Sequence, residues 1–168
     1  MTVSGQPIRR KEDLRFITGK GRYTDDVNLP DQCHAIFARS PVAHANITSI
    51  DTTVAAGMPG VRLVLTGTDY AKSALGTLIC GWMIHSKDGG EMKPGVHPPL
   101  ALEKVRYVGD PVAVVIADSR QMARDAAEMI DVEYEQLAAV VSLKNAAGHE
   151  SSVHNDVPGN VAFDWELG

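Results

Sequence analysis

The pattern of apolar and polar positions is most informative over residues 103–135. Two short runs rich in β-branched residues, 105–108 and 112–117, flank the Gly-Asp-Pro segment 109–111. This segment favours a turn, because Pro fixes φ and Gly permits unusual backbone angles. The run 112–117 contains no polar residue, which is typical of a strand buried on both faces. We therefore expect a central strand at 112–117.

A helix and a second strand are predicted after this run. Asp118 or Ser119 can cap the helix. Its apolar residues recur at intervals of three and four and form one stripe: Met122, Ala123, Ala126, Met129 and Ile130. Residues 131–135 alternate polar and apolar, as a half-buried strand does. Strand, helix and strand make a crossover unit, whose strands lie parallel with a right-handed connection if they share one sheet. The predicted fold is α/β (α+β), a single domain with a mixed sheet.

The chain is predicted to consist of an N-terminal arm, residues 1–30, and a domain, residues 31–168. Ile8, Leu14 and Phe16 lie among mixed charges in the arm, which favours an extended segment pinned by these residues over a free helix. Further elements are predicted in the domain: strands at 33–40, 44–51 and 61–66, a helical turn at 52–56, an extended run at 137–141 and a weak helix at 142–147.

Two segments of the domain have irregular patterns. Residues 70–102 are rich in Gly and Pro and predict a long excursion, in which Trp82 and Met83 need an apolar environment. The tail, residues 150–168, has turn chemistry and then an alternation with Val161, Phe163 and Trp165 on one face. Because the chain stops within this strand-like alternation, we expect the sequence to be part of a longer polypeptide.

Composition excludes several classes of protein. The chain has 168 residues, 44% hydrophobic and 22% charged, which is typical of one soluble globular domain. A net charge of −5 with interspersed signs argues against nucleic-acid binding. The first 16 residues lack the apolar core of a signal peptide, and no apolar run approaches the roughly 20 residues of a membrane span. We therefore expect a cytoplasmic protein without a membrane span.

No residue pattern predicts an active site. The histidines lack HxH or HExxH spacing; His34 and His44 could hold a metal across a hairpin, but polar roles at strand ends are preferred. Asp131, Glu133 and Glu135 share one face of a strand, and we expect a solvated face there rather than a carboxylate pair. Catalytic, cofactor-binding and metal-binding residues are all predicted to be absent from this segment.

Two other features carry little chemical signal. The Gly-Lys-Gly segment 19–21 lacks the remaining residues of a phosphate-binding loop. Cys33 and Cys80 lie far apart without CxxC context, so we expect neither a disulfide nor a zinc site. A serine in a GxSxG elbow, the anchor of many hydrolases, is also missing.

Four stretches of the chain resemble one known family. They read GQPIRRKEDLRFITGKGRYTDDVNLPDQCHAIFARSPVAHANITSID, MPGVRLVLTGTDY, PPLALEKVRYVGDPVAVVIADSRQMARDAAEMIDVEYEQLAAVV and VHNDVPGNVAFDWELG. In this order they are similar to the N-terminal region of the molybdopterin-binding large subunit of the xanthine dehydrogenase and aldehyde oxidase family. The opening pattern PIxRxEDxRFxTGxGxYxDD most resembles the carbon monoxide dehydrogenase large chain.

The resemblance implies an α/β hammerhead domain at residues 31–168, with the tail from 150 leading into cofactor domains that this sequence does not contain. It also implies a molybdopterin-type molybdenum cofactor in the full subunit, with iron–sulfur clusters and FAD on partner subunits. The full enzyme would hydroxylate an aldehyde, a heterocycle or carbon monoxide. In the family, the catalytic glutamate and the loop over the metal come from downstream domains, and Cys33 and Cys80 do not match the copper-binding loop cysteine.

Two functions are therefore open. The chain can be a non-catalytic scaffold that packs on the molybdopterin-binding domains, and this hypothesis predicts exposed apolar surface around Val161, Phe163, Trp165 and Trp82. Alternatively, it can be a stand-alone interaction module that retains the fold without enzyme activity. The second hypothesis predicts a closed, polar surface.

Overall fold

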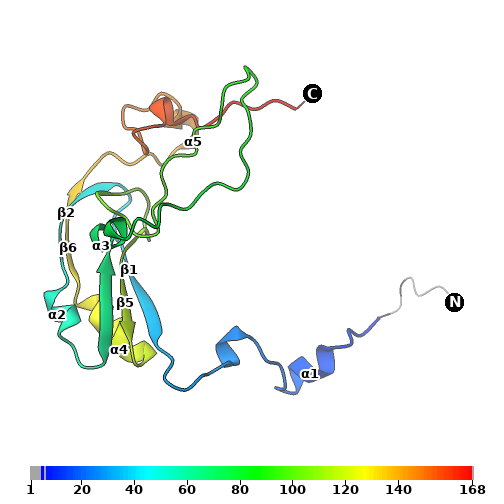
Figure 1. The fold of residues 1–168 in the computed structure, drawn as a ribbon. Coiled ribbons are helices and arrows are strands. Elements are labelled where there is room, and N and C mark those ends of the chain that lie inside the picture. The colour runs from blue at the N-terminus through cyan, green and yellow to red at the C-terminus, as the bar shows by residue number, and fades with distance from the viewer. Residues whose placement is uncertain (1–4, 6, 168) are drawn as a thin grey trace. The chain divides into compact units, whose positions relative to one another are not determined.

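The computed structural model describes residues 5 and 7–167 (Figure 1). The chain divides into two compact units, the first ending at Gln32 and the second beginning at Cys33. The division into an arm at residues 1–30 and a domain at residues 31–168 stays a prediction.

The first unit contains two short helical segments, the one-turn helix α1, Asp13–Ile17, and the 3₁₀ turn η1, Thr24–Asp26. The Thr18 hydroxyl donates a hydrogen bond to the Leu14 carbonyl at 2.6 Å and closes the last turn of α1. The predicted extended arm is therefore wrong at this point, because local hydrogen bonds form a helical turn. Ile8 and Leu14, which were expected to pin the arm, are exposed.

Two three-stranded antiparallel sheets make up the regular part of the second unit. The first sheet has the order β1-β5-β3, with β1 at His34–Arg39, β5 at Pro111–Ala117 and β3 at Val61–Thr66. The second has the order β4-β2-β6, with β4 at Lys104–Val105, β2 at Ala45–Asp51 and β6 at Asp131–Gln136.

The predicted strand–helix–strand unit is present as β5, α4 (Arg120–Glu128) and β6, but its strands lie in different sheets. β6 pairs antiparallel with β2, so that Asp51 lies opposite Asp131. The predicted mixed sheet is thus replaced by two antiparallel sheets. The pairing partner of β6 is β2, which lies about 80 residues earlier in the chain, so the local pattern of the unit does not indicate it.

β5 is the central strand of the first sheet, as its apolar run predicts. β1 and β3 pair with its two edges, and Val112, Ala113, Val115 and Ala117 are all buried. Val115 and Ala117 pack with Ala55, Ala123 and Ala126 in one apolar cluster. Burial on both faces therefore follows from strand position, which confirms the sequence-based interpretation of this run.

Helix α4 covers one face of the first sheet (Figure 1). The Ser119 hydroxyl accepts a hydrogen bond from the Met122 amide at 3.2 Å, which confirms the predicted cap. Ala123 and Ala126 form the buried centre of the predicted stripe, whereas Met122 and Met129 are about half exposed. The two alanines let the helix lie close to the strands.

A second apolar cluster packs on the other sheet. Its buried residues are Ala45, Ala101, Val105 and Val112, and Val132 and Tyr134 of β6 pack against them. Because Val132 and Tyr134 alternate with exposed residues, β6 has the predicted half-buried pattern. β4 ends at Val105, short of the predicted strand at 105–108, because the Arg106 amide bonds to the Asp110 carboxylate and the Asp110 amide bonds to the Tyr107 carbonyl in a turn.

Short helices complete the regular structure: α2 at Thr53–Ala56, α3 at Gly67–Lys72, α5 at Leu143–Ala146 and the 3₁₀ turn η2 at Pro158–Asn160. Thr66 and Asp69 form a reciprocal capping box at the start of α3. A Cβ atom at Gly67 would collide with the backbone of Ala101, so only glycine fits there.

The segment 73–103 has no helix or strand and only two isolated bridges, Leu78 with His97 and His85 with Glu91. The predicted irregular excursion, residues 70–102, is therefore wrong at residues 70–72, which belong to α3, and agrees with the structure from residue 73 onward. The tail does not form the strand expected around Val161, Phe163 and Trp165. Instead, the tail lies along the excursion. The Lys87 amide donates a hydrogen bond to the Asp164 carbonyl, and the Lys93 amide donates one to the Ala162 carbonyl.

Candidate functional site

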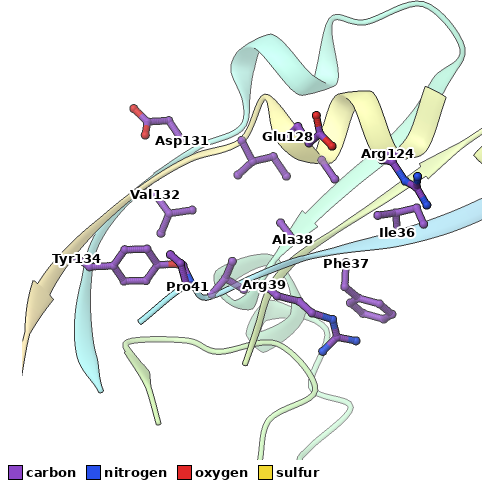
Figure 2. Close-up of a pocket in the computed structure, with 13 residues that line it drawn as sticks. Ile36, Phe37, Ala38, Arg39, Pro41, Arg124, Glu128, Asp131, Val132 and Tyr134 are labelled. Atoms are coloured by element: carbon purple, nitrogen blue, oxygen red, sulfur yellow. The ribbon is translucent and has the colours of Figure 1, made fainter. Parts of the chain in front are cut away.

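A groove of about 510 Å³ lies between β1, α4 and β6 (Figure 2). β1 is an edge strand of the first sheet and β6 is an edge strand of the second. The groove therefore runs between two open strand edges. Its floor consists mainly of apolar side chains: Ile36, Ala38, Val112, Ala127, Ile130 and Val132.

Charged side chains of both signs line the rim of this groove. Arg39 from β1 and Arg124 from α4 are basic, whereas Glu128 from α4 and Asp131 from β6 are acidic (Figure 2). Arg39 donates a hydrogen bond to the Gly109 carbonyl at 2.8 Å. The rim suits a protein partner with charges of both signs better than a single small ion.

Tyr134 lies at one end of the groove. Burial raises the pKa of its phenol, whereas a hydrogen bond with the Ser40 side chain acts in the opposite direction. The phenol therefore stays protonated at neutral pH. No nucleophile or general base is indicated by this arrangement.

The excursion exposes a run of large apolar side chains, which we call the excursion surface: Leu75, Leu78, Ile79, Trp82 and Met83. Ile79 is 90% exposed and Trp82 is 80% exposed. Such a run is unusual on a solvated monomer and typical of an interaction surface. In the tail, Val161, Phe163 and Trp165 are also substantially exposed.

Asn160 fixes the loop that precedes the tail. Its side-chain oxygen accepts a hydrogen bond from the Val153 amide at 2.8 Å. Its side-chain amide donates to the carbonyls of Ala146 and Ser151, at 3.1 and 2.9 Å. Three backbone groups are thereby satisfied by one side chain, and the Arg106 guanidinium joins the same loop to β4 by donating to the Val153 carbonyl at 3.1 Å.

His154 packs between this loop and the excursion. Its ring lies 5.2 Å from that of His97, and a Cβ atom at Gly95 would approach its Nδ1 within 2.6 Å. Nδ1 is buried and has no hydrogen-bond partner. Burial lowers the pKa of His154, and the nearby charges of Arg106 and His97 lower it further, against smaller opposing effects of Asp156 and Asp110.

The histidine hairpin considered from the sequence does not form. β1 pairs with β5 and β2 pairs with β6, so His34 and His44 do not face each other. His44 is buried, and its Nδ1 lies 2.8 Å from the Ala138 carbonyl oxygen. Among the described residues, no group of three His, Cys, Asp or Glu side chains lies close enough to hold a metal ion.

The acidic face of β6 is solvated, as expected. Asp131, Glu133 and Glu135 are exposed, and the two glutamates accept hydrogen bonds from Ser49 and Asn46 of β2 at 2.9 Å. In the segment 19–21, a Cβ atom at Gly21 would approach the Phe16 ring within 2.9 Å, which gives this glycine a packing role. Cys33 and Cys80 are free and exposed.

The groove was not predicted from the sequence. Neither were the three hydrogen bonds that the Asn160 side chain makes to backbone groups, which we call the Asn160 clamp. The groove depends on which strands end up at sheet edges, which the apolar pattern does not encode. The clamp had a weak local signal, since the Gly-Asn pair at 159–160 after Pro158 favours left-handed backbone, and Asn160 has φ of +57°.

No helix in the described residues is long and apolar enough to cross a bilayer.

Residues 18–138 match the family model described as the aldehyde oxidase and xanthine dehydrogenase a/b hammerhead domain. The chain belongs to this family. The hammerhead domain is 40% identical to the nicotine 6-hydroxylase large subunit of Paenarthrobacter nicotinovorans, over 96% of this chain and 19% of that protein. The resemblance seen in the sequence is therefore confirmed.

Two solved structures share the hammerhead fold. Quinoline 2-oxidoreductase from Pseudomonas putida is 39% identical with a TM-score of 0.77, over 92% of this chain and 19% of that one. A Cu,Mo-CO dehydrogenase is also 39% identical, with a TM-score of 0.70, over 86% of this chain and 17% of that one. The chain thus spans about a fifth of the length of these relatives.

Proposed function

We propose that this chain acts as the non-catalytic scaffold domain of a molybdenum hydroxylase large subunit. Membership of the hammerhead family carries the proposal, because the matching relatives are large oxidoreductase subunits of which this fold forms about a fifth. The full enzyme would hydroxylate an aldehyde, a heterocycle or carbon monoxide. Iron–sulfur and FAD subunits would take up the electrons, and the substrate would be selected by residues outside the hammerhead domain.

The groove between β1, α4 and β6 does not fit a molybdopterin site. A pterin requires a cavity with several converging hydrogen-bonding groups. The groove between β1 and β6 has an apolar floor instead, and its rim consists of four exposed charged side chains. We therefore assign the cofactor to other domains of the subunit and derive no chemical step within this chain.

The exposed apolar side chains support a scaffold role. The excursion surface and the tail expose the residues that the scaffold hypothesis predicts, including Trp82 at 80% and Trp165 at 58%. A stand-alone module was expected to have a closed, polar surface, so this observation favours the scaffold. The excursion surface would pack on the molybdopterin-binding domains of the same subunit.

A chimera tests the proposal. Residues 1–168 would replace the matching segment of the nicotine 6-hydroxylase large subunit, and molybdenum content and kcat/KM for nicotine would be measured in the assembled enzyme. The expected result is retained molybdenum and retained preference for nicotine, because the scaffold does not select the substrate. Full assembly with a changed substrate preference would contradict the proposal.

Two chimera variants sharpen the result. Trp82→Asp places a charge in the excursion surface and is expected to impair assembly, since that charge would be buried against the neighbouring domain. Glu133→Gln is the matched control on an exposed face and is expected to leave assembly unchanged. Equal behaviour of the two variants would contradict the assignment of the excursion surface to domain packing.

A further inference from the structure

Residues 73–99 of the excursion are held to the rest of the second unit by few contacts. None of them is buried, and none belongs to either apolar cluster. The amides of Lys87 and Lys93 donate hydrogen bonds to the carbonyls of Asp164 and Ala162 in the tail, at 2.7 and 2.9 Å. Segments with little buried apolar surface open locally at a small free-energy cost. A single unfavourable contact can therefore open this one.

One further contact joins the excursion to the loop that precedes the tail. The ring of His154, on this loop, lies 5.2 Å from the ring of His97, on the excursion. The Gly95 backbone, with φ of +71°, lies so close that a Cβ atom there would come within 2.6 Å of His154 Nδ1. This Nδ1 is buried and has no hydrogen-bond partner among the described residues. The excursion thus packs directly against an unpaired ring nitrogen.

The charged groups around His154 offer no acceptor for a proton on Nδ1. Arg106 adds a positive charge, and so does His97 when it is protonated. The Asp110 carboxylate already accepts a hydrogen bond from the Arg106 amide at 2.9 Å, and Asp156 is exposed. Burial lowers the pKa of His154, the charges of Arg106 and His97 lower it further, and the two carboxylates oppose them more weakly.

We propose that His154 and residues 95–97 form an acid-sensitive latch, which holds the excursion to the loop before the tail and releases it when His154 is protonated. In the closed latch the uncharged ring packs against Gly95 and His97. A proton on Nδ1 would enter this contact without an acceptor, and a buried charge that lacks a partner is costly. Separation of the excursion lets water reach the ring and removes that cost.

The direction of the pH effect follows from which state binds the proton more tightly. In the open latch His154 has its ordinary pKa of 6.5, and in the closed latch its pKa is lower. The closed state therefore has its full stability above about pH 6.5 and loses stability as the pH falls below this value. Asp164 raises the pKa of Lys87, so Lys87 stays charged throughout this range and does not contribute.

The latch is a property of this chain alone and does not depend on the proposed scaffold function. Its consequence for assembly does depend on that function. Residues 73–99 carry the excursion surface, so an open latch would change how Trp82 and its neighbours meet the molybdopterin-binding domains. Measurements on the 168-residue chain report on the latch and the chimera reports on assembly, which keeps the two failures distinguishable.

Native-state hydrogen exchange at two pH values tests the latch, with rates corrected for the intrinsic pH dependence of exchange. The reporter is the Lys93 amide, whose hydrogen bond to the Ala162 carbonyl joins the excursion to the tail. We expect its protection to fall by up to about tenfold between about pH 7.5 and about pH 5.5, the limit reached if His154 is protonated only in the open latch. Amides of the central strand β5 should keep their protection.

Two variants of His154 isolate its role. His154→Phe keeps a ring in the latch that cannot bind a proton, and His154→Gln removes the ring together with the titration. Both should make the protection of the Lys93 amide independent of pH in this range, even where the glutamine lowers it overall. His85→Gln is the matched control, because His85 is an exposed histidine of the same excursion. It should respond to pH as the unchanged chain does.

Three results would overturn the proposal. The first is a change of less than about twofold in the protection of the Lys93 amide between the two pH values. The second is a pH response that persists in both His154 variants, because another group, such as His97 or His149, would then carry it. The third is an equal loss of protection at β5, which would show unfolding of the whole unit instead of opening of the latch.

Discussion

Replacing Asn160 by alanine should release the loop before the tail. The substitution removes three hydrogen bonds of 2.8 to 3.1 Å and leaves the Val153 amide and the carbonyls of Ala146 and Ser151 without this partner. A hydrogen bond contributes about 1 kcal/mol net, so the upper limit is about 3 kcal/mol. Because the loop is only half-buried and water can replace some bonds, we expect a loss of about 2 kcal/mol.

Native-state hydrogen exchange measures this loss locally. The Val153 amide should lose about 2 kcal/mol of protection, which corresponds to roughly 30-fold faster exchange, while β5 amides should change little. Asn160→Asp is an informative partner variant, because it keeps the acceptor for Val153 and removes both donors. Its effect on the Val153 amide should be smaller than that of alanine.

A glycine variant separates hydrogen bonding from backbone strain. Asn160 has φ of +57°, which glycine adopts without cost and alanine does not. Asn160→Gly should therefore destabilise the loop less than Asn160→Ala but still lose protection at Val153. Unchanged protection in all three variants would refute the assignment of the clamp.

Three further predictions concern the core, the titrating histidine and the acidic face. Gly67→Ala should destabilise the fold by at least about 2 kcal/mol in urea unfolding, because its Cβ atom would strike the Ala101 backbone; a change below about 0.5 kcal/mol would contradict this packing. Because the folded-state pKa of His154 lies below its ordinary value of 6.5, its neutral form favours folding: the full stability should be present above about pH 6.5 and should decline as the pH falls below it. His154→Gln should flatten the pH dependence of the unfolding midpoint in this range, and an identical slope in both proteins would show that another group is responsible. Replacing Glu133 and Glu135 together by glutamine should leave the thermal midpoint nearly unchanged, because both side chains are exposed, and a large shift would show that the face is not simply solvated.

Most helices and strands of the second unit were predictable from the local sequence pattern. The uninterrupted apolar run of β5 indicated a strand buried on both faces, and Ser119 marked the start of α4, since both signals arise from neighbouring residues. The alternation of Val132 and Tyr134 with acidic residues likewise indicated the half-buried strand β6. Such features depend on local periodicity and were predicted correctly.

Features that depend on pairing between distant residues were not predicted. The pattern of β5, α4 and β6 does not indicate that β6 pairs with β2. We therefore expected a mixed sheet, whereas the structure has two antiparallel sheets. The groove arises from that topology, because this strand order places β1 and β6 at sheet edges. The tail resembled a strand in its alternation, but isolated contacts of Asp164 and Ala162 with Ser86, Lys87 and Lys93 hold it instead.

The central claim is that the hammerhead domain is a scaffold without its own molybdenum chemistry. The most direct measurement is the molybdenum content of the purified 168-residue chain after expression in a host that makes the molybdopterin cofactor. We expect the chain to contain no more molybdenum than the same protein prepared from a host unable to make the cofactor, and to hydroxylate neither nicotine nor quinoline nor aldehydes. Stoichiometric molybdenum together with substrate turnover by the chain alone would contradict it.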